Sequence, residues 1–156
     1  MNRKTVVMKP EVPVRIVLTD PPPGVLFGIQ RGRGAAYTTE FAQQRERGDL
    51  SFDFSIVVSD NRKDGAPNFL GDFVQGPPSR RFAYIDVGTY AGQKDTPWSR
   101  RIIIPFDGIT WALIRKIQAK TGHRLSAAIA GRGKDGSPSC ATVPIVGGWR
   151  IVKDSR

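Results

Sequence analysis

One stretch decides the fold: Leu50-Ser-Phe-Asp-Phe-Ser-Ile-Val-Val58, in which large apolar residues occupy every second position. Successive side chains of a strand point to opposite faces of a sheet, so this alternation predicts a strand with one buried face. The stretch from Val12 to Leu18 repeats the pattern around Arg15. After it, Pro21-Pro-Pro-Gly24 forces a turn, because proline fixes φ and glycine lets the chain reverse. The first third of the chain is therefore predicted to be β.

The rest of the chain adds strands and a single helix. Strands are predicted at 25–30, 80–87, 99–104, 124–130, 141–145 and 149–152, while 37–45 fits either a strand or a short polar helix. One helical pattern lies at about 108–121, where Asp107 or Thr110 would cap the start and Gly122 the end. Many short strands with Gly/Pro turns indicate a mainly β fold (α+β at most), an antiparallel β-sandwich or barrel with that one helix.

Length and charge set the organisation of the chain. Its 156 residues suit one domain, so we predict a basic N-terminal tail over 1–10 and a single β-rich domain over 11–156. Lys and Arg total 24 against 14 Asp and Glu, a net charge of +10 that attracts polyanions even without a dedicated site. No export signal follows the first residues, and no stretch approaches the ~20 apolar residues that span a bilayer. We expect a cytoplasmic protein without a membrane partner.

Chemistry based on metals or thiols is disfavoured by composition. With one histidine, His123, and one cysteine, Cys140, a zinc site, an iron–sulfur site or an internal disulfide is close to excluded, and we predict no metal or cofactor. Gly131-Arg-Gly133-Lys-Asp-Gly136 has the spacing of a dinucleotide fingerprint, but a strand-like stretch follows it, which predicts a hairpin loop. No nucleophile, base and orienting group can be assembled from spacing. A small hydrolase or isomerase that uses Asp53 or Asp86 is one open alternative.

The stretch from Asp86 to Arg101 is the best candidate contact surface. Its predicted loop exceeds the two to five residues usual for hairpins. It carries groups that combine apolar area with hydrogen bonding, and cations: Tyr90, Gln93, Trp98, Arg100 and Arg101. Adjacent arginines on a strand point to opposite faces, so one of them needs an acidic partner, and we predict the ion pair Asp86–Arg101. The sequence favours a non-enzymatic binding or accessory domain for a small molecule or a polyanion.

Nucleic-acid binding is the first alternative to this binding domain, ahead of the hydrolase or isomerase. The strand Arg81-Phe-Ala-Tyr-Ile-Asp-Val87 resembles the aromatic strand of RNA-recognition motifs, with Phe82 and Tyr84 in the stacking positions and Arg80 and Arg81 as cations. That fold needs two helices in alternation with strands, and this chain offers one. Exposed rings beside arginines are nevertheless a stacking platform, although burial of both rings in the core is the more common arrangement.

Several stretches together resemble a family of small bacterial proteins of unknown function: Asp20-Pro-Pro-Pro-Gly-Val25, Asn68-Phe-Leu-Gly71, Gln75-Gly-Pro-Pro78, Gly88-Thr-Tyr-Ala-Gly-Gln93, Trp98-Ser-Arg-Arg101, Gly108-Ile-Thr-Trp111 and Asp135-Gly-Ser-Pro-Ser-Cys-Ala-Thr-Val-Pro144. The resemblance implies a bacterial source and a single domain from about residue 20 to the last strand. It implies no reaction, ligand or catalytic residue.

Overall fold

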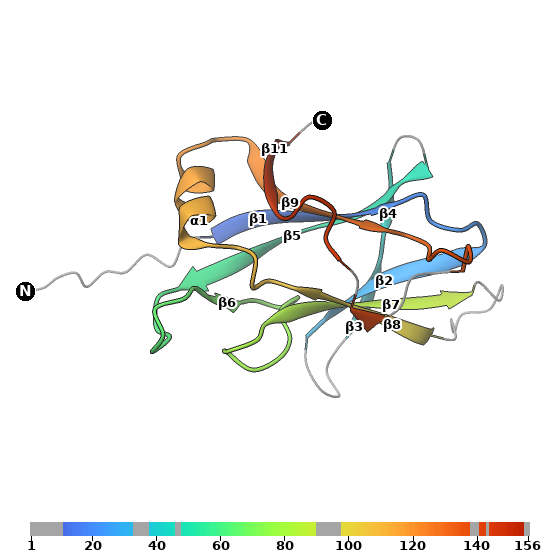
Figure 1. Cartoon of the computed structure of the whole chain (residues 1–156), viewed down its shortest axis with the longest axis horizontal. Coiled ribbons are helices and arrows are strands. Elements are labelled where there is room, and N and C mark those ends of the chain that lie inside the picture. Colours follow the sequence, from blue (N-terminus) through green and yellow to red (C-terminus); the bar gives the residue numbers. More distant parts are fainter. Residues whose placement is uncertain are drawn as a thin grey trace, which may run out of the picture.

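The structure, a computed structural model, consists of two β-sheets that face one another, with one helix at an end of the molecule (Figure 1). It describes residues 11–32, 38–45, 48–89, 98–137, 141–142 and 144–154. The predicted tail over 1–10 and Cys140 lie outside these ranges. The prediction of a mainly β fold with one helix is confirmed for the described residues.

The first sheet has the strand order β11-β9-β1-β5-β4. β4 pairs with the N-terminal end of β5, and β6 pairs with its C-terminal end. Its strands are β1 (Glu11–Thr19), β4 (Gln43–Gln44), β5 (Leu50–Ser59), β6 (Asn68–Leu70), β9 (His123–Ala130) and β11 (Arg150–Lys153). The second sheet has the order β10-β8-β7-β2-β3. Its strands are β2 (Val25–Arg31), β3 (Thr38–Phe41), β7 (Phe82–Thr89), β8 (Trp98–Pro105) and β10 (Ala141–Thr142).

Two strand pairs depart from a purely antiparallel arrangement. β9 runs parallel to β1, and β10 runs parallel to β8. Both additions come late in the chain, after the helix α1 (Trp111–Gln118) has carried it from the second sheet back to the first. A parallel neighbour needs a long crossover, and four strands of the second sheet, β2, β3, β7 and β8, lie between β1 and β9 along the chain.

The core lies between the two sheets and follows the predicted alternation. On β5, Phe52, Phe54, Ile56 and Val58 are buried, and the paired strand β1 buries Val12, Val14, Ile16 and Leu18. The second sheet contributes Phe27, Ile29, Ala83, Ile85, Val87, Ile102 and Ile104. Since both inner faces bury continuous apolar rows, one core holds the sandwich together.

The helix is shorter than the predicted 108–121. Thr110 is its N-cap, and the Thr110 hydroxyl accepts a hydrogen bond from the Leu113 amide at 3.2 Å. Ile114 and Ile117 are buried, so the apolar side packs inward as the spacing predicted. Gly122 adopts φ +75°, but it lies beyond the C-cap Ala119, where it leads into β9.

The ambiguous stretch 37–45 contains two short strands that belong to different sheets. β3 pairs with β2, and β4 pairs with β5. Between them, the Ala42 amide donates to the Phe27 carbonyl at 3.0 Å. The chain therefore passes from one sheet to the other at this point.

The glycine-rich stretch after β9 forms a turn and not the start of a helix. The Gly133 amide donates to the Ser137 carbonyl at 2.7 Å, and the Gly131 amide donates to the Thr19 carbonyl at 2.7 Å. The absence of a helix start in this stretch agrees with the prediction, but the loop is not the predicted hairpin, because the strands on either side, β9 and β10, belong to different sheets. Because Gly131 has no side chain, its backbone can pack directly against the backbone of residues 19–21.

We expect the substitution Gly131→Ala to lower the free energy of unfolding by about 1–3 kcal/mol, the usual cost of overpacking. A Cβ atom at residue 131 would lie 2.7 Å from the Pro21 Cα and 2.8 Å from the Thr19 carbonyl oxygen. Gly133→Ala is the matched control, because its Cβ would meet nothing closer than an Asp135 carboxylate oxygen at 3.4 Å. Urea denaturation of both variants measures the difference, and equal losses would contradict the close packing at Gly131.

Candidate functional site

The outer face of the second sheet gathers aromatic and charged side chains. On β2 and β7, the pairs Phe27–Val87 and Ile29–Ile85 point into the core. Side chains at the alternate positions must point outward. We call the resulting set the aromatic–arginine face: Gln30, Phe82, Tyr84, Asp86 and Arg101.

Two rings and a guanidinium group form its centre. The ring centroids of Phe82 and Tyr84 are 4.8 Å apart, and the Arg101 Cζ lies 4.3 Å from the centroid of the Tyr84 ring. Such contacts between cation and ring are worth ~0.5–1 kcal/mol at exposed sites. Both rings are half-buried and lie outside the core, contrary to the more common arrangement expected from the sequence. The reason is parity, because Ala83 and Ile85 take the core side of the same strand.

The structure contains the ion pair between Asp86 and Arg101. These residues are direct partners across β7 and β8, and the Arg101 Nε donates to Asp86 Oδ1 at 2.9 Å. The Asp86 side chain is 4 % exposed, whereas that of Arg101 is 46 % exposed. Partial burial lowers the pKa of Arg101, but the hydrogen bond and the charge of Asp86 outweigh it, so that pKa lies above its ordinary value. Asp86 therefore holds a charged guanidinium over the Tyr84 ring.

Gln30 is a member of this face that the sequence reasoning missed. It lies on the same side of β2 as Gly28, whose strand partner on β7 is Asp86. The Gln30 side chain is buried, and its Oε1 accepts no hydrogen bond from any described residue. A buried acceptor without a partner costs ~1–3 kcal/mol. The oxygen is itself buried, so a ligand on the outer surface does not reach it. The signal that could have identified Gln30 in the sequence is a polar residue directly after the apolar positions of a predicted strand.

The structure describes the other predicted site residues to different extents. Tyr90 and Gln93 lie outside the described ranges, and only the backbone of Trp98 and Arg100 is described, paired with Gly88 and Val87. Among the cations of the nucleic-acid alternative, Arg80 is exposed in the turn before β7.

Arg81 does not join that surface. It is buried, and it donates to the Asn68 Oδ1 at 3.3 Å and to the Gly76 carbonyl. Its position in the sequence has the parity of the core residues Ala83 and Ile85, which explains why it points away from Phe82 and Tyr84.

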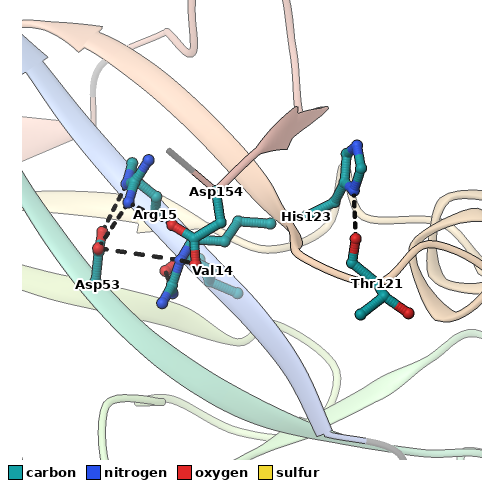
Figure 2. Close-up of polar contacts among 7 residues, drawn as sticks. Val14, Arg15, Asp53, Thr121, His123 and Asp154 are labelled. Carbon is teal, nitrogen blue, oxygen red and sulfur yellow. Dashed lines mark hydrogen bonds and ion pairs between the residues drawn. The ribbon is translucent and has the colours of Figure 1, made fainter. Parts of the chain in front are cut away.

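A second polar cluster lies on the outer face of the first sheet, shown in Figure 2. Arg15 donates from Nε and Nη2 to the two carboxylate oxygens of Asp53, both at 2.8 Å, and from Nη2 to Asp154 at 3.1 Å. Arg124 Nε lies 3.0 Å from Asp154 and 4.0 Å from Asp53. We call these four residues the Arg15 network. His123 lies apart from it, with its Nδ1 3.0 Å from the Thr121 carbonyl oxygen (Figure 2).

The Arg15 network suits a structural role better than proton transfer. Burial raises the pKa of Asp53, but the hydrogen bond and charge of Arg15, with the charges of Arg124 and Arg45, lower that pKa below its ordinary value overall. A general base for neutral pH needs a pKa shifted upward. The network joins β1, β5 and β9 to Asp154, just beyond β11, and so ties the last strand to the sheet.

Two searches of the described residues gave negative findings. No group of three or more His, Cys, Asp or Glu side chains in these ranges could hold a metal ion. Nor does the described part of the chain contain a helix with the length and apolar character needed to cross a bilayer.

Comparison with known proteins gave one match. A model described as a family of unknown function, DUF5990, matches residues 12–152. No curated protein and no solved structure matches the chain significantly.

Proposed function

Since this chain belongs to the DUF5990 family, whose function is unknown, we propose its role from its surface chemistry: it is a cytoplasmic binding or accessory domain. Its contact surface is the aromatic–arginine face, extended by the stretch 88–101, which begins at the end of β7 and finishes in β8. The ligand is a small molecule that contains a nucleobase and an anionic group.

The Arg101–Tyr84 contact is the observation that supports this proposal. Arg101 is half exposed, yet its guanidinium is fixed over the Tyr84 ring by a carboxylate that is almost fully buried. Holding an arginine in one rotamer costs side-chain entropy, and surface ion pairs alone give little stability in return. The arrangement is better explained as preparation for a ligand, because a fixed side chain loses less entropy when the ligand binds.

The class of ligand follows from the chemistry of the face. Phe82, Tyr84 and the guanidinium of Arg101 offer aromatic and cationic surface on which a planar ring can stack. The exposed charge of Arg101 attracts an anionic group, and the net charge of +10 assists the approach. A nucleoside monophosphate combines a planar ring with an anionic group.

We expect at least one of the four nucleoside monophosphates AMP, GMP, CMP and UMP to bind, and Tyr84→Ala to weaken that binding about tenfold. The loss corresponds to a stacking contribution of ~1–3 kcal/mol. Tyr84→Phe keeps the ring and should bind as the parent does. Isothermal titration calorimetry measures all three affinities.

Arg31→Ala is the matched control for Arg101→Ala. Arg31 is also half exposed, and its Cζ also lies over a ring, 5.7 Å from the Phe73 centroid. It follows Gln30 on β2 but has the parity of Phe27 and Ile29, so its side chain leaves the strand on the face opposite to the aromatic–arginine face. Arg101→Ala should weaken binding, whereas Arg31→Ala should leave it unchanged. If none of the four nucleotides binds, or if both arginine variants behave alike, this function is wrong. The contributions of Tyr90, Gln93 and Trp98 stay predictions that alanine variants test by the same titration.

Single-stranded nucleic acid is the second candidate ligand. It is favoured by two neighbouring rings on the outer face of a sheet, 4.8 Å apart, beside an exposed cation. A short single-stranded RNA should then bind with an affinity that falls steeply with salt, because phosphate contacts release counterions. RNA binding without mononucleotide binding would favour this candidate over the first.

A further inference from the structure

Exposed cations gather at the end of the molecule that carries α1. The helix buries Ile114 and Ile117, whereas Arg115 and Lys116 are exposed. Lys120 lies just beyond the helix, four residues after Lys116, and is also exposed. The helix lies against β11, which adds a further exposed cation at its end (Figure 1). We call the four residues Arg115, Lys116, Lys120 and Lys153 the α1 patch.

The pairing of β11 with β9 brings Lys153 to this end. Lys153 is the strand partner of His123, and the Asp154 amide donates to the Gly122 carbonyl at 2.7 Å. The end of β11 therefore lies beside the segment that leads from α1 into β9. His123 has the parity of the core residue Leu125, so Lys153 leaves β11 on the side of the sheet where α1 packs.

The α1 patch has no neutralising carboxylates. None of its four side chains forms an ion pair with another residue in the described ranges, whereas Arg31, Arg62 and Arg132 each pair with a carboxylate. Lys116 and Lys120 are four residues apart, a spacing at which like charges repel one another. The helix dipole favours cations in the last turn, but it does not account for Lys153, which lies on a strand.

We propose that the α1 patch binds the phosphate backbone of duplex nucleic acid without reading its sequence. Contacts between cations and phosphates supply essentially all of the free energy of such binding, so a patch of charge alone is sufficient. Phosphates on the two strands of a duplex also present the charge density that four neighbouring cations can neutralise. The patch is separate from the aromatic–arginine face, which belongs to the second sheet.

The chemistry of the patch disfavours the other anionic partners. A membrane-bound helix inserts apolar side chains, but α1 packs its apolar side into the core. Protein interfaces depend on apolar or aromatic anchors, and the exposed large hydrophobic residues of the described chain, Phe41 and Val146, lie outside the patch. Single strands bind through stacked rings, and none of the four members is aromatic. A duplex backbone is the partner that needs none of these groups.

Fluorescence anisotropy with a labelled DNA duplex of arbitrary sequence tests the proposal. Four phosphate contacts predict that log K falls with log salt with a slope of about −3.6, and therefore a loss of about fiftyfold between roughly 50 and 150 mM salt. The double substitution Lys116→Gln with Lys120→Gln should reduce the slope to about −1.8, because two contacts are lost. Both lysines are exposed, and glutamine has a similar helix propensity, so the variant should fold as the parent does.

Lys134→Gln is the matched control for Lys120→Gln. Both lysines are exposed and unpaired in the described chain, and both changes remove one charge. β9 separates them by eight residues, about 26 Å of strand, which exceeds the Debye length of ~10 Å at 0.1 M salt. At roughly 50 mM salt, Lys120→Gln should weaken duplex binding about tenfold, the loss of one phosphate contact, and Lys134→Gln should leave it unchanged.

The proposal is overturned if the duplex does not bind at low salt, or if Lys120→Gln and Lys134→Gln weaken binding equally. Vesicles that contain phosphatidylserine are the second probe. Vesicle binding that depends on Lys120, without duplex binding, would assign the patch to a membrane surface instead. Tyr84→Ala should leave duplex binding unchanged, and Lys120→Gln should leave AMP binding unchanged. A loss of duplex binding in Tyr84→Ala would place the duplex on the aromatic–arginine face and overturn the proposal.

Discussion

Replacing Arg15 by methionine is expected to lower the free energy of unfolding by about 3 kcal/mol, the cost of breaking a buried ion pair from one side. The Arg15 side chain is 7 % exposed and makes two hydrogen bonds to Asp53 and one to Asp154. Methionine keeps most of the volume but leaves both carboxylates without this cation. Urea denaturation at pH 7 measures the loss.

Arg31→Met is the matched control. Arg31 also pairs with two carboxylates, Glu40 at 3.0 Å and Asp72 at 3.3 Å, but all three side chains are well exposed. Exposed pairs contribute ~0–1 kcal/mol, so this variant should remain close to the parent. Equal losses in the two variants would show that burial does not set the contribution of the Arg15 network.

The same network predicts how the difference depends on pH. The pKa of Asp53 in the folded protein lies below its ordinary value, because Arg15 and its neighbours outweigh the effect of burial. A carboxyl with a lowered pKa stabilises the folded state above its unfolded pKa, about 3.9, and loses that contribution as pH falls through the folded pKa. The gap between the parent and Arg15→Met should therefore shrink between pH 5 and pH 2. A gap that widens in acid would contradict the assignment.

The second large effect is expected from Phe106→Ala, which should lower the free energy of unfolding by about 3–5 kcal/mol. Phe106 is fully buried, and its ring centroid lies 5.6 Å from that of Phe69 and 5.9 Å from that of Trp149. Phe69 lies on β6, and Trp149 directly precedes β11, and both strands belong to the first sheet. Phe106 lies in the link from β8 to α1, so the cavity would open where this link packs against the first sheet.

Phe41→Ala makes the same chemical change at a position that is 58 % exposed. It should cost less than about 1 kcal/mol, because it opens no enclosed cavity. Thermal and urea denaturation of both variants give the comparison. A small loss in Phe106→Ala would mean that the junction of α1 with the sheets does not contribute to the common core.

Much of the fold could be predicted from local pattern. The alternation in 50–58 predicted β5 and its buried face, because the period of two is set by the strand backbone itself. The helix followed from its apolar spacing and the Thr110 cap. The sequence predicts Asp86 as the partner of an arginine on the buried side of the sheet. The structure confirms the pair with Arg101 but places it on the outer face, where the Arg101 side chain is 46 % exposed. The sequence left 37–45, which contains β3 and β4, open between strand and helix, and it did not predict β6. Each of these short strands is paired with a longer neighbour, which local pattern does not identify.

By itself, then, the sequence determined where the long strands lie, which faces β1 and β5 bury, and that a helix follows β8. Only the tertiary structure decided which strands share a sheet, that β9 and β10 join their neighbours in parallel, and that Phe82 and Tyr84 lie outside the core. It alone assembled the Arg15 network and the α1 patch, whose members come from distant parts of the chain, as Arg15 and Asp154 do. Periodicity reports the environment of each residue along its own strand, whereas these contacts depend on how the strands are ordered, which local pattern does not encode.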